Sequence, residues 1–262
     1  WGKGLGGRPL YTGTSLMRRL FFNGILADEI EIVGSDAHHI MHVMRGKMGD
    51  KVTVVGKNRE VALMEMVRFS SDAVALHLLK KFDADTESPL FLTLYQCLLK
   101  GEKMDFALQK AVELGINRIV PVVSQNVVVK FDAKKCRAKR VRWQKIADEA
   151  AKQCGRTELV TVEDVMELRD LLFEKKHAKD FGTLLFCYEN EERRSAKKAL
   201  RELADEKISI LIGSEGGFTP EEAERVKASG AETISLGRRI LRAETAAMTA
   251  LAIVQYEKGD LG

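Results

Sequence analysis

The sequence predicts an α/β protein with a mostly parallel sheet, preceded by a smaller strand-rich part. Near-continuous apolar segments such as residues 183–188 and 208–213 are typical of strands that are buried on both faces of a parallel sheet. After Pro89, helical patterns alternate with these segments. Before residue 83, apolar residues recur at every second position, which favours the short strands of a small barrel or sandwich.

The domain boundaries follow from this change in periodicity. Residues 1–16 are glycine-rich and lack periodicity, so we interpret them as a non-native remnant, with a native arm as the alternative. Residues 17–84 form the strand-rich domain, and a polar linker precedes the α/β domain at residues 89–262. The strands expected in the first domain are residues 51–56, 59–69 and 73–82.

The α/β domain shows alternating strands and helices. The expected strands are residues 90–99, 118–123, 183–188, 208–213 and 233–236. The expected helices are residues 103–115, 132–153, 195–204, 219–229 and 244–257. The clearest helix start is Thr219, because Thr219 and Glu222 are spaced for a capping box around Pro220.

Composition excludes several classes of protein. No apolar run approaches the roughly 20 residues needed to cross a bilayer, and no signal peptide is visible. The formal net charge of +4 is too small to identify a partner, so the local distribution of charge must do so. Four dispersed cysteines without a C-x-x-C pair disfavour a disulfide scaffold or a zinc site and indicate a cytoplasmic protein.

Two glycine-led loops follow predicted strands, GSEGGF at residues 213–218 and LGRRILRAETAA at residues 236–247. Ligands of parallel α/β sheets bind beyond the C-terminal ends of the strands. The first loop alone is equally compatible with a plain strand-to-helix turn, but two neighbouring loops favour a shared ligand site. G-x-G-x-x-G after a strand and G-x-x-x-x-G-K-[ST] are both missing from the sequence, which disfavours a nicotinamide dehydrogenase and a P-loop enzyme.

These loops resemble a known family. GSEGGF followed by SLGRRILRAETAA is similar to the SPOUT-class RNA methyltransferases, specifically the family that methylates N3 of a uridine in 16S ribosomal RNA. The similarity extends to residues 38–50, 100–115 and 142–156, in the family's order. Ser214 and Arg238 stand where the family usually or often has proline, Cys154 where serine is common, and Val160 where proline is common. None of these departures removes a group that the chemistry requires.

The resemblance implies a fold, a cofactor and partners. It implies a PUA-like RNA-binding β-barrel before a SPOUT domain whose C-terminus is threaded into a trefoil knot. It further implies S-adenosylmethionine as cofactor, a homodimer, and 16S ribosomal RNA or the small ribosomal subunit as substrate, with no membrane partner. The alternatives are another SPOUT enzyme, acting on a ribose 2′-hydroxyl or a guanine, and an RNA-binding protein without catalysis.

The residues themselves suggest roles at this site. Glycines allow close approach of the backbone, apolar side chains form walls, and a carboxylate suits the cationic sulfonium. The expected cofactor-binding residues are Gly213, Glu215, Gly216, Leu236, Gly237, Ile240, Leu241, Thr245 and Ala246. Arg242 and Glu244 are the expected catalytic residues, as stabiliser of negative charge and as general base. The alternatives are that Glu244 only favours a helix N-terminus, or that orientation alone suffices.

Basic residues predict the RNA surface. The segment from Lys130 to Lys145 carries eight positive residues and one acidic residue, which indicates phosphate contacts, although a solvated helix face is the alternative. The expected RNA-binding residues are Arg18, Arg19, His42, Arg45, Lys47, Lys100, Lys103, Arg140, Arg142 and Arg156. His38, His39 and His42 lack an acidic or cysteine partner, so we expect capping or RNA contact there and no metal.

Overall fold

The computed structural model describes residues 19–84, 86–127, 133–189 and 195–262. Some of the predictions concern residues outside these ranges, namely residues 1–16, Arg18 and Lys130. Contacts between Cα atoms divide the chain into two compact units, Trp1–Asp85 and Thr86–Gly262.

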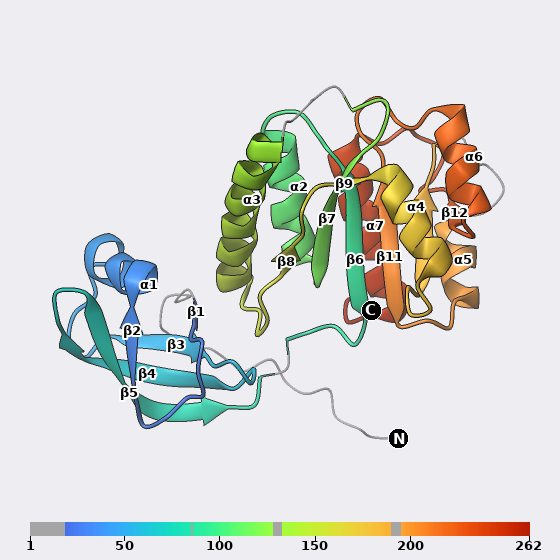
Figure 1. Ribbon diagram of the computed structural model, residues 1–262. Helices are drawn as coiled ribbons and strands as arrows, with labels where there is room; N and C mark the ends of the chain where they lie inside the picture. Colours follow the sequence, from blue (N-terminus) through green and yellow to red (C-terminus); the bar gives the residue numbers. More distant parts are fainter. Residues whose placement is uncertain (1–18, 85, 128–132, 190–194) are drawn as a thin grey trace, which may run out of the picture. The chain divides into compact units, whose positions relative to one another are not determined.

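The N-terminal unit is a curled five-stranded sheet in the order β1-β3-β4-β5-β2 (Figure 1). Strands β1 and β3 are parallel, and the other neighbours are antiparallel. Its elements are β1 (Leu20–Phe21), β2 (Glu29–Val33), α1 (Gly34–His38), the π-helix η1 (His39–Val43), β3 (Lys51–Val55), β4 (Val61–Phe69) and β5 (Ala73–Phe82). The three strands predicted here are confirmed as β3, β4 and β5.

Alternation of apolar and polar residues explains how this sheet encloses its core. Val52 and Val54 of β3 are fully buried, whereas the intervening Thr53 is only partly covered. Met64 of β4 and Ile40 of η1 join the same buried cluster. One face of the sheet is thus packed while the other remains accessible.

The C-terminal unit contains a seven-stranded sheet in the order β12-β10-β11-β6-β7-β8, with β9 also paired to β7. All of these pairs are parallel, so the predicted mostly parallel α/β fold is confirmed. The strands are β6 (Phe91–Cys97), β7 (Arg118–Val123), β8 (Thr161–Val162), β9 (Met166–Glu167), β10 (Thr183–Cys187), β11 (Lys207–Ile212) and β12 (Glu232–Ile234). The helices are α2 (Glu102–Glu113), α3 (Ala133–Cys154), α4 (Leu168–His177), α5 (Ala196–Glu202), α6 (Pro220–Ala228) and α7 (Ala243–Lys258).

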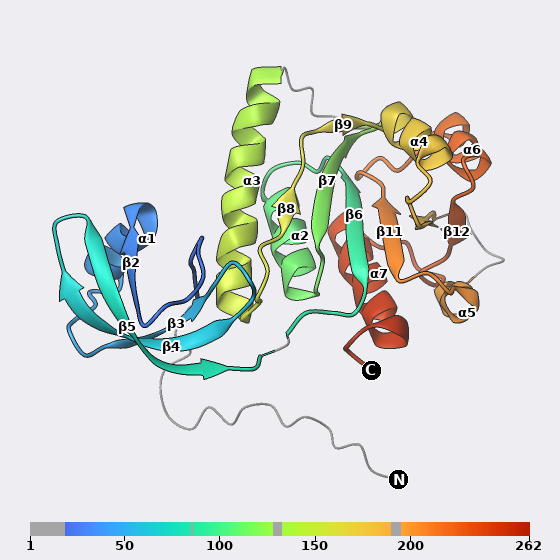
Figure 2. The same ribbon diagram turned by 60° about the horizontal axis from the view of Figure 1, so that its bottom comes forward.

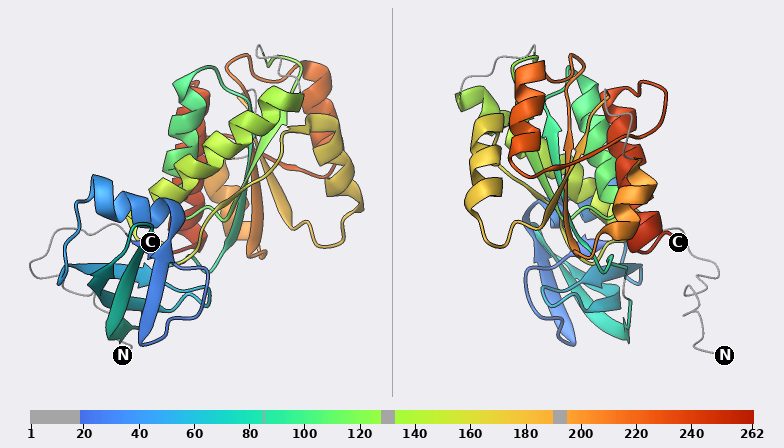
Figure 3. Two further views of the ribbon diagram at one scale, coloured as in Figure 1. Left: turned by 60° about the vertical axis from the view of Figure 1, so that its left-hand side comes forward. Right: turned by 90° about the vertical axis from the view of Figure 1, so that its right-hand side faces the viewer.

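Helices cover both faces of this sheet. Helices α2, α5 and α7 lie on one face, and α4 and α6 lie on the other (Figures 1 and 3). Helix α3 packs against α2 and β8 (Figure 2). This double cover explains why β6 and β11 are buried almost throughout.

Helix α6 begins where the sequence predicts. The Thr219 hydroxyl accepts a hydrogen bond from Glu222 N (3.2 Å), and Thr219 N donates to Glu222 Oε2 (3.1 Å). This capping box satisfies two backbone donors at the start of the helix. The helix therefore starts at a fixed point after the GSEGGF loop.

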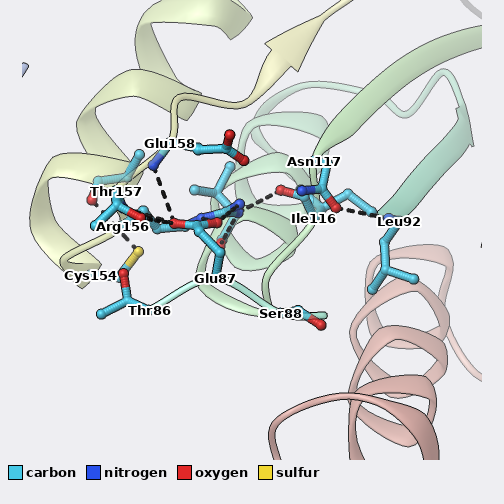
Figure 4. A network of polar contacts seen from close by, with 12 residues as sticks. Thr86, Glu87, Ser88, Leu92, Ile116, Asn117, Cys154, Arg156, Thr157 and Glu158 are labelled. Carbon is cyan, nitrogen blue, oxygen red and sulfur yellow. Dashed lines mark hydrogen bonds and ion pairs between the residues drawn. The ribbon is translucent and has the colours of Figure 1, made fainter. Parts of the chain in front are cut away.

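A buried ion pair joins the beginning of the C-terminal unit to its interior (Figure 4). The side chains of Glu87 and Arg156 are 6% and 5% exposed. Arg156 Nε donates to Glu87 Oε2 (3.0 Å), and Arg156 Nη1 donates to the carbonyls of Val112 and Ile116. Glu87 Oε1 also accepts from Thr157 N (2.8 Å). One pair thereby connects the segment before β6 with the ends of α2 and α3.

Helix α7 is fastened to the same region. Gln255 is fully buried; its Nε2 donates to the Leu114 carbonyl (3.0 Å), and its Oε1 accepts from the Ser88 hydroxyl (2.8 Å). Gly115 has φ +82°, and a Cβ there would lie 2.3 Å from Gln255 Nε2. Glycine is therefore required at this position both to end α2 and to admit Gln255.

We expect Glu87→Gln to lower the free energy of unfolding by about 3 kcal/mol, because Arg156 would remain buried without an opposite charge. Burial alone would raise the pKa of Glu87, but the hydrogen bonds and charge of Arg156 hold that pKa below its ordinary 4.5. The stabilisation from this lowered pKa is therefore present above about pH 4.5 and is lost as pH falls through the folded-state pKa. Urea unfolding from pH 7 to pH 3 measures both effects.

The matched control for this experiment is Glu224→Gln, which removes an exposed i,i+3 partner of Lys227. We expect it to change the free energy of unfolding by about 0.3 kcal/mol. Equal effects of the two substitutions on the free energy of unfolding would contradict the role given to Glu87. The same holds if Glu87→Gln loses as much stability between pH 7 and pH 3 as the unmodified protein.

Candidate functional site

Three loops meet at one edge of the parallel sheet, where β10, β11 and β12 end (Figure 1). Because the strands run in the same direction, their C-terminal ends lie along a common edge. A cavity opens between the loops. It is lined by residues 187–189 after β10, by residues 212–214 and 217 after β11, and by residues 235–241, 243 and 246 after β12.

The GSEGGF loop is shaped by close packing. Gly217 has φ +61°, and a Cβ there would lie 2.6 Å from Glu189 Oε1. Only glycine therefore lets the Glu189 carboxylate approach this backbone. The ring of Phe218 packs edge-on against Phe186 of β10, with centroids 5.1 Å apart, and anchors the loop in the core.

A second loop braces GSEGGF from the side. This β7 loop comprises residues 124–127. Asn126 Nδ2 donates to the Gly216 carbonyl (2.9 Å), and the Ser214 hydroxyl donates to the Asn126 carbonyl (3.4 Å). A Cβ on Gly216 would lie 3.0 Å from Asn126 Cβ, so the two loops are in close contact.

Glu215 has a structural partner outside the cavity. Its Oε1 accepts from Lys103 Nζ (3.1 Å) and from Lys100 N (3.2 Å), which ties GSEGGF to the start of α2. Burial alone would raise the pKa of Glu215, but these hydrogen bonds hold it below its ordinary value. The carboxylate is therefore ionised at neutral pH and is engaged by Lys103.

Arg242 and Glu244 lie at the start of α7. Arg242 is the N-cap residue and is exposed, and its carbonyl accepts from Ala246 N (2.8 Å). Glu244 lies in the first turn, and its Oε2 is buried with no hydrogen-bond partner among the described residues. Ala243 between them lines the cavity, whereas Arg242 and Glu244 themselves do not. A buried carboxylate oxygen without a partner is available to accept a proton or a hydrogen bond.

The structure brings most of the expected cofactor-binding residues together. The cavity-lining ones are Gly213, Leu236, Gly237, Ile240, Leu241 and Ala246. Glu215, Gly216 and Thr245 do not line the cavity. Glu215 and Gly216 instead make the contacts that hold the GSEGGF loop.

Sequence reasoning missed the third wall of the cavity, formed by Cys187, Tyr188 and Glu189. A signal was present, because a polar residue directly follows the apolar segment 183–188. The rule that ligands bind at the C-terminal ends of parallel strands applies to this strand as well. Glu189 is the carboxylate that lies in the cavity.

Two of the expected RNA-binding residues are not available on the surface. Arg156 is 4% exposed and is held by Glu87, so it has a structural role in place of the expected RNA contact. Arg19 is 8% exposed, and its Nη1 has no hydrogen-bond partner among the described residues. A buried guanidinium cannot reach a phosphate without rearrangement.

The other expected RNA-binding residues that the structure describes differ in their surroundings. Arg142 forms an ion pair with Asp105, and Arg140 Nε donates to the Val162 carbonyl (2.9 Å). Lys103 is bound to Glu215. Arg142 is exposed despite its ion pair, and His42, Arg45, Lys47 and Lys100 are exposed as well.

The described residues offer neither a metal site nor a helix that could span a membrane. They contain no group of three or more histidine, cysteine, aspartate or glutamate side chains arranged to hold a metal ion. The ring centroids of His38 and His42 are 4.4 Å apart, with the ring planes tilted by 46°. No described helix has both the length and the apolar character needed to cross a membrane.

The fold and the loops at its edge are those of an RNA methyltransferase. The model of the RNA methyltransferase domain family matches residues 86–255, and the chain belongs to this family. It is 34% identical over 236 residues to ribosomal RNA small subunit methyltransferase E of Bacillus subtilis (strain 168), covering 88% of this chain and 91% of that protein. The enzyme of that name from Buchnera aphidicola subsp. Schizaphis graminum is also 34% identical, over 247 residues, covering 88% and 92%.

A solved structure agrees with these relatives. Ribosomal RNA small subunit methyltransferase E from Neisseria gonorrhoeae, bound to S-adenosyl methionine, is 28% identical and superposes with a TM-score of 0.83. The match covers 94% of this chain and 100% of that one. The family predicted from the two loops is therefore confirmed.

We expect the Cys187 thiol to react slowly although it lines the cavity, because burial raises its pKa to about 12. At pH 8 its thiolate fraction should be on the order of 10³-fold below that of an ordinary thiol. Alkylation by iodoacetamide, followed by mass spectrometry of the Cys187 peptide, measures this rate in native and urea-unfolded protein. Because Cys187 is only partly buried by its accessible surface, a native rate close to the unfolded rate would contradict the raised pKa of this thiol.

Proposed function

We propose that the protein transfers a methyl group from S-adenosylmethionine to N3 of a uridine in 16S ribosomal RNA of the small subunit. The observation that carries the proposal is the cavity between the two glycine-led loops, one of which runs into the first turn of α7 with Arg242 and Glu244. The chain belongs to the RNA methyltransferase family, and its relatives are named for the small-subunit ribosomal RNA.

The residues of the cavity fit this cofactor. Leu236 and Leu241 offer apolar walls for the adenine, and the backbone of the glycine-led loops offers donors and acceptors. Glu189 supplies a carboxylate for the ribose hydroxyls or the positive sulfonium. When bound, S-adenosylmethionine supplies an electrophilic methyl group.

Glu244 and Arg242 handle charge at the uracil. The N3 proton of uridine must leave because the nitrogen attacks through its lone pair. Glu244 Oε2 accepts that proton, and the Arg242 guanidinium stabilises the negative charge that develops on the uracil oxygens. The protein also holds N3 in line with the methyl group, which itself lowers the barrier.

Several finer properties belong to the same proposal. The curled N-terminal sheet is a PUA-like RNA-binding barrel, and the C-terminal unit carries a trefoil knot. The protein acts in the cytoplasm as a homodimer. The dimer is supported by the alanine-rich helix α7 and by exposed aromatic residues on two packed helices, Phe106 of α2 (43%) and Tyr256 of α7 (65%).

We assign the RNA-binding surface to exposed basic residues. His42, Arg45 and Lys47 serve the N-terminal unit, and Lys100 serves the C-terminal unit. Lys103, Arg140 and Arg142 contribute where their present partners can exchange for phosphate. These contacts carry the electrostatic part of the affinity.

The test is mass mapping of methylated nucleotides after incubation with S-adenosylmethionine and either small-subunit particles or naked 16S RNA. We expect one new methyl group on N3 of a uridine. A methyl group on a ribose or a guanine would refute the substrate and favour another SPOUT activity. Failure to bind S-adenosylmethionine in calorimetry at high micromolar concentration would refute the methyltransferase activity and leave an RNA-binding protein.

We expect Glu244→Gln to lower kcat by about 10²-fold while the Kd for S-adenosylmethionine changes little, because the amide cannot accept the N3 proton. The matched control is Glu102→Gln, an exposed acidic residue in the first turn of α2. If Glu244 only favours its helix N-terminus, both variants retain activity and lose similar stability. A loss confined to cofactor binding would also contradict the role as base.

A further inference from the structure

A second concave surface lies beside the cofactor cavity, on the other side of the GSEGGF loop. It is lined by residues of α4, α6 and the end of β7, and we name it the α4–α6 groove. Figures 1 and 2 show where these elements lie. Its volume is about 680 Å³, which is large enough for more than one nucleotide-sized group. The residues that line it include Ser124, Arg169, Phe173, Lys176 and Arg225.

The groove presents an aromatic ring to solvent. Phe173 is 65% exposed, and its ring stacks on His177 with centroids 4.2 Å apart. Leu172 adjoins it in the apolar lining of the groove. An exposed ring beside an apolar floor is a platform on which a nucleobase stacks regardless of its identity.

Positive side chains surround this platform. Arg169, Lys176 and Arg225 line the groove and are exposed. Arg169 Nε lies 3.6 Å from Asp170, and Arg225 Nε donates to the Glu221 carbonyl (3.3 Å). Neither Asp170 nor Glu221 lines the groove, whereas all three basic residues do.

The acidic residues of the groove do not offset this charge. Two carboxylates line it, Glu167 and Glu222. Glu222 is 2% exposed and accepts from Gln125 N (2.8 Å) and Thr219 N (3.1 Å), so it is occupied by backbone donors. Three permanent cations therefore face one exposed carboxylate, which favours an anionic occupant.

A buried polar atom also belongs to the groove. Ser124 is 5% exposed and lines the groove, and its hydroxyl lies near the Cys97 thiol. The hydroxyl makes no hydrogen bond of ordinary geometry to the described residues. Because this oxygen is itself buried, Ser124 forms part of the wall of the groove and is not a contact for its occupant.

The groove is coupled to the cofactor cavity by the β7 loop. Gln125 of this loop lines the groove, and its Oε1 accepts from the Thr219 hydroxyl (3.2 Å). The adjacent Asn126 bonds to Ser214 and Gly216 of GSEGGF. The same short loop therefore forms a wall of the groove and braces the GSEGGF loop beside the cavity.

We propose that the α4–α6 groove binds a single-stranded segment of the substrate RNA next to the target nucleotide. A base stacks on Phe173, and phosphates pair with Arg169, Lys176 and Arg225. The inference rests on the proposed function for the identity of the RNA. It adds a binding surface that lies outside the basic residues identified in the sequence.

The test compares two double variants with the same change in net charge. Lys176→Glu with Arg225→Glu reverses the groove, and Lys197→Glu with Lys198→Glu reverses exposed lysines of α5 on the opposite face of the sheet (Figure 3). The probe is an unmodified 16S RNA fragment that carries the target uridine in a single-stranded segment. Fluorescence anisotropy at several salt concentrations gives Kd and its salt dependence.

We expect the groove variant to raise the Kd for this RNA at least tenfold more than the α5 variant. Its slope of log Kd against log salt should fall by roughly 1.4, the value for two lost single-strand phosphate contacts. Phe173→Ala should raise Kd about tenfold with an unchanged slope, because it removes stacking without charge. The Kd for S-adenosylmethionine should stay constant in all variants.

The result that overturns the inference is equal RNA affinity and equal salt slope in the groove and α5 variants, together with no effect of Phe173→Ala. Failure of the proposed function is distinguishable, because it is measured on the unmodified protein as absence of an N3-methyluridine. All the substituted side chains are exposed, so we expect every variant to fold. Thermal melts followed by circular dichroism identify any variant that does not. Phe173→Ala tests the stacking separately, because it changes no charge.

Discussion

The buried pair of Glu87 and Arg156 is the interaction on which the C-terminal unit depends. Taking both charges out of water is costly, and the cost is offset only because every remaining oxygen and nitrogen finds a partner. Those partners lie at the start of β6, the end of α2 and the turn after α3. The pair thus fixes the relative positions of the elements that frame one side of the sheet, and β6 is the central strand that adjoins β11.

From that framework, the parallel direction of the strands determines where chemistry can occur. The turns after β7, β10, β11 and β12 all emerge at one edge, so residues far apart in the sequence meet there without long insertions. Beyond the strand ends, hydrogen bonds between neighbouring loops hold the loops in place, as the ladder of backbone hydrogen bonds does within the sheet. Asn126 against Gly216 and Glu215 against Lys103 are examples, and both hold GSEGGF from outside the cavity.

Local patterns predicted much of this arrangement, and long-range pairing explains the remainder. The capping box at Thr219 and the apolar strands are properties of adjacent residues, so the sequence contains them directly. Helix α4 was missed because it follows a two-residue strand and has no side-chain cap at Glu167. The role of Arg156 was also hidden, because its partner lies 69 positions earlier and no local feature marks that pairing. Glu189 is a similar case, since only tertiary structure shows that it opposes Gly217.

The exposed side chain of Ile240, in the loop after β12, affects the heat capacity of any binding event at the cavity. Its side chain is 88% exposed at the mouth of the cavity, so a branched apolar group stays in water while the site is open. Any partner that covers it removes this surface from water, and burial of apolar area lowers the heat capacity. Association at this mouth therefore carries a negative heat-capacity change whose size reports how much of the loop is covered. Calorimetry of binding at several temperatures can therefore report whether a partner covers Ile240, whether or not methyl transfer follows.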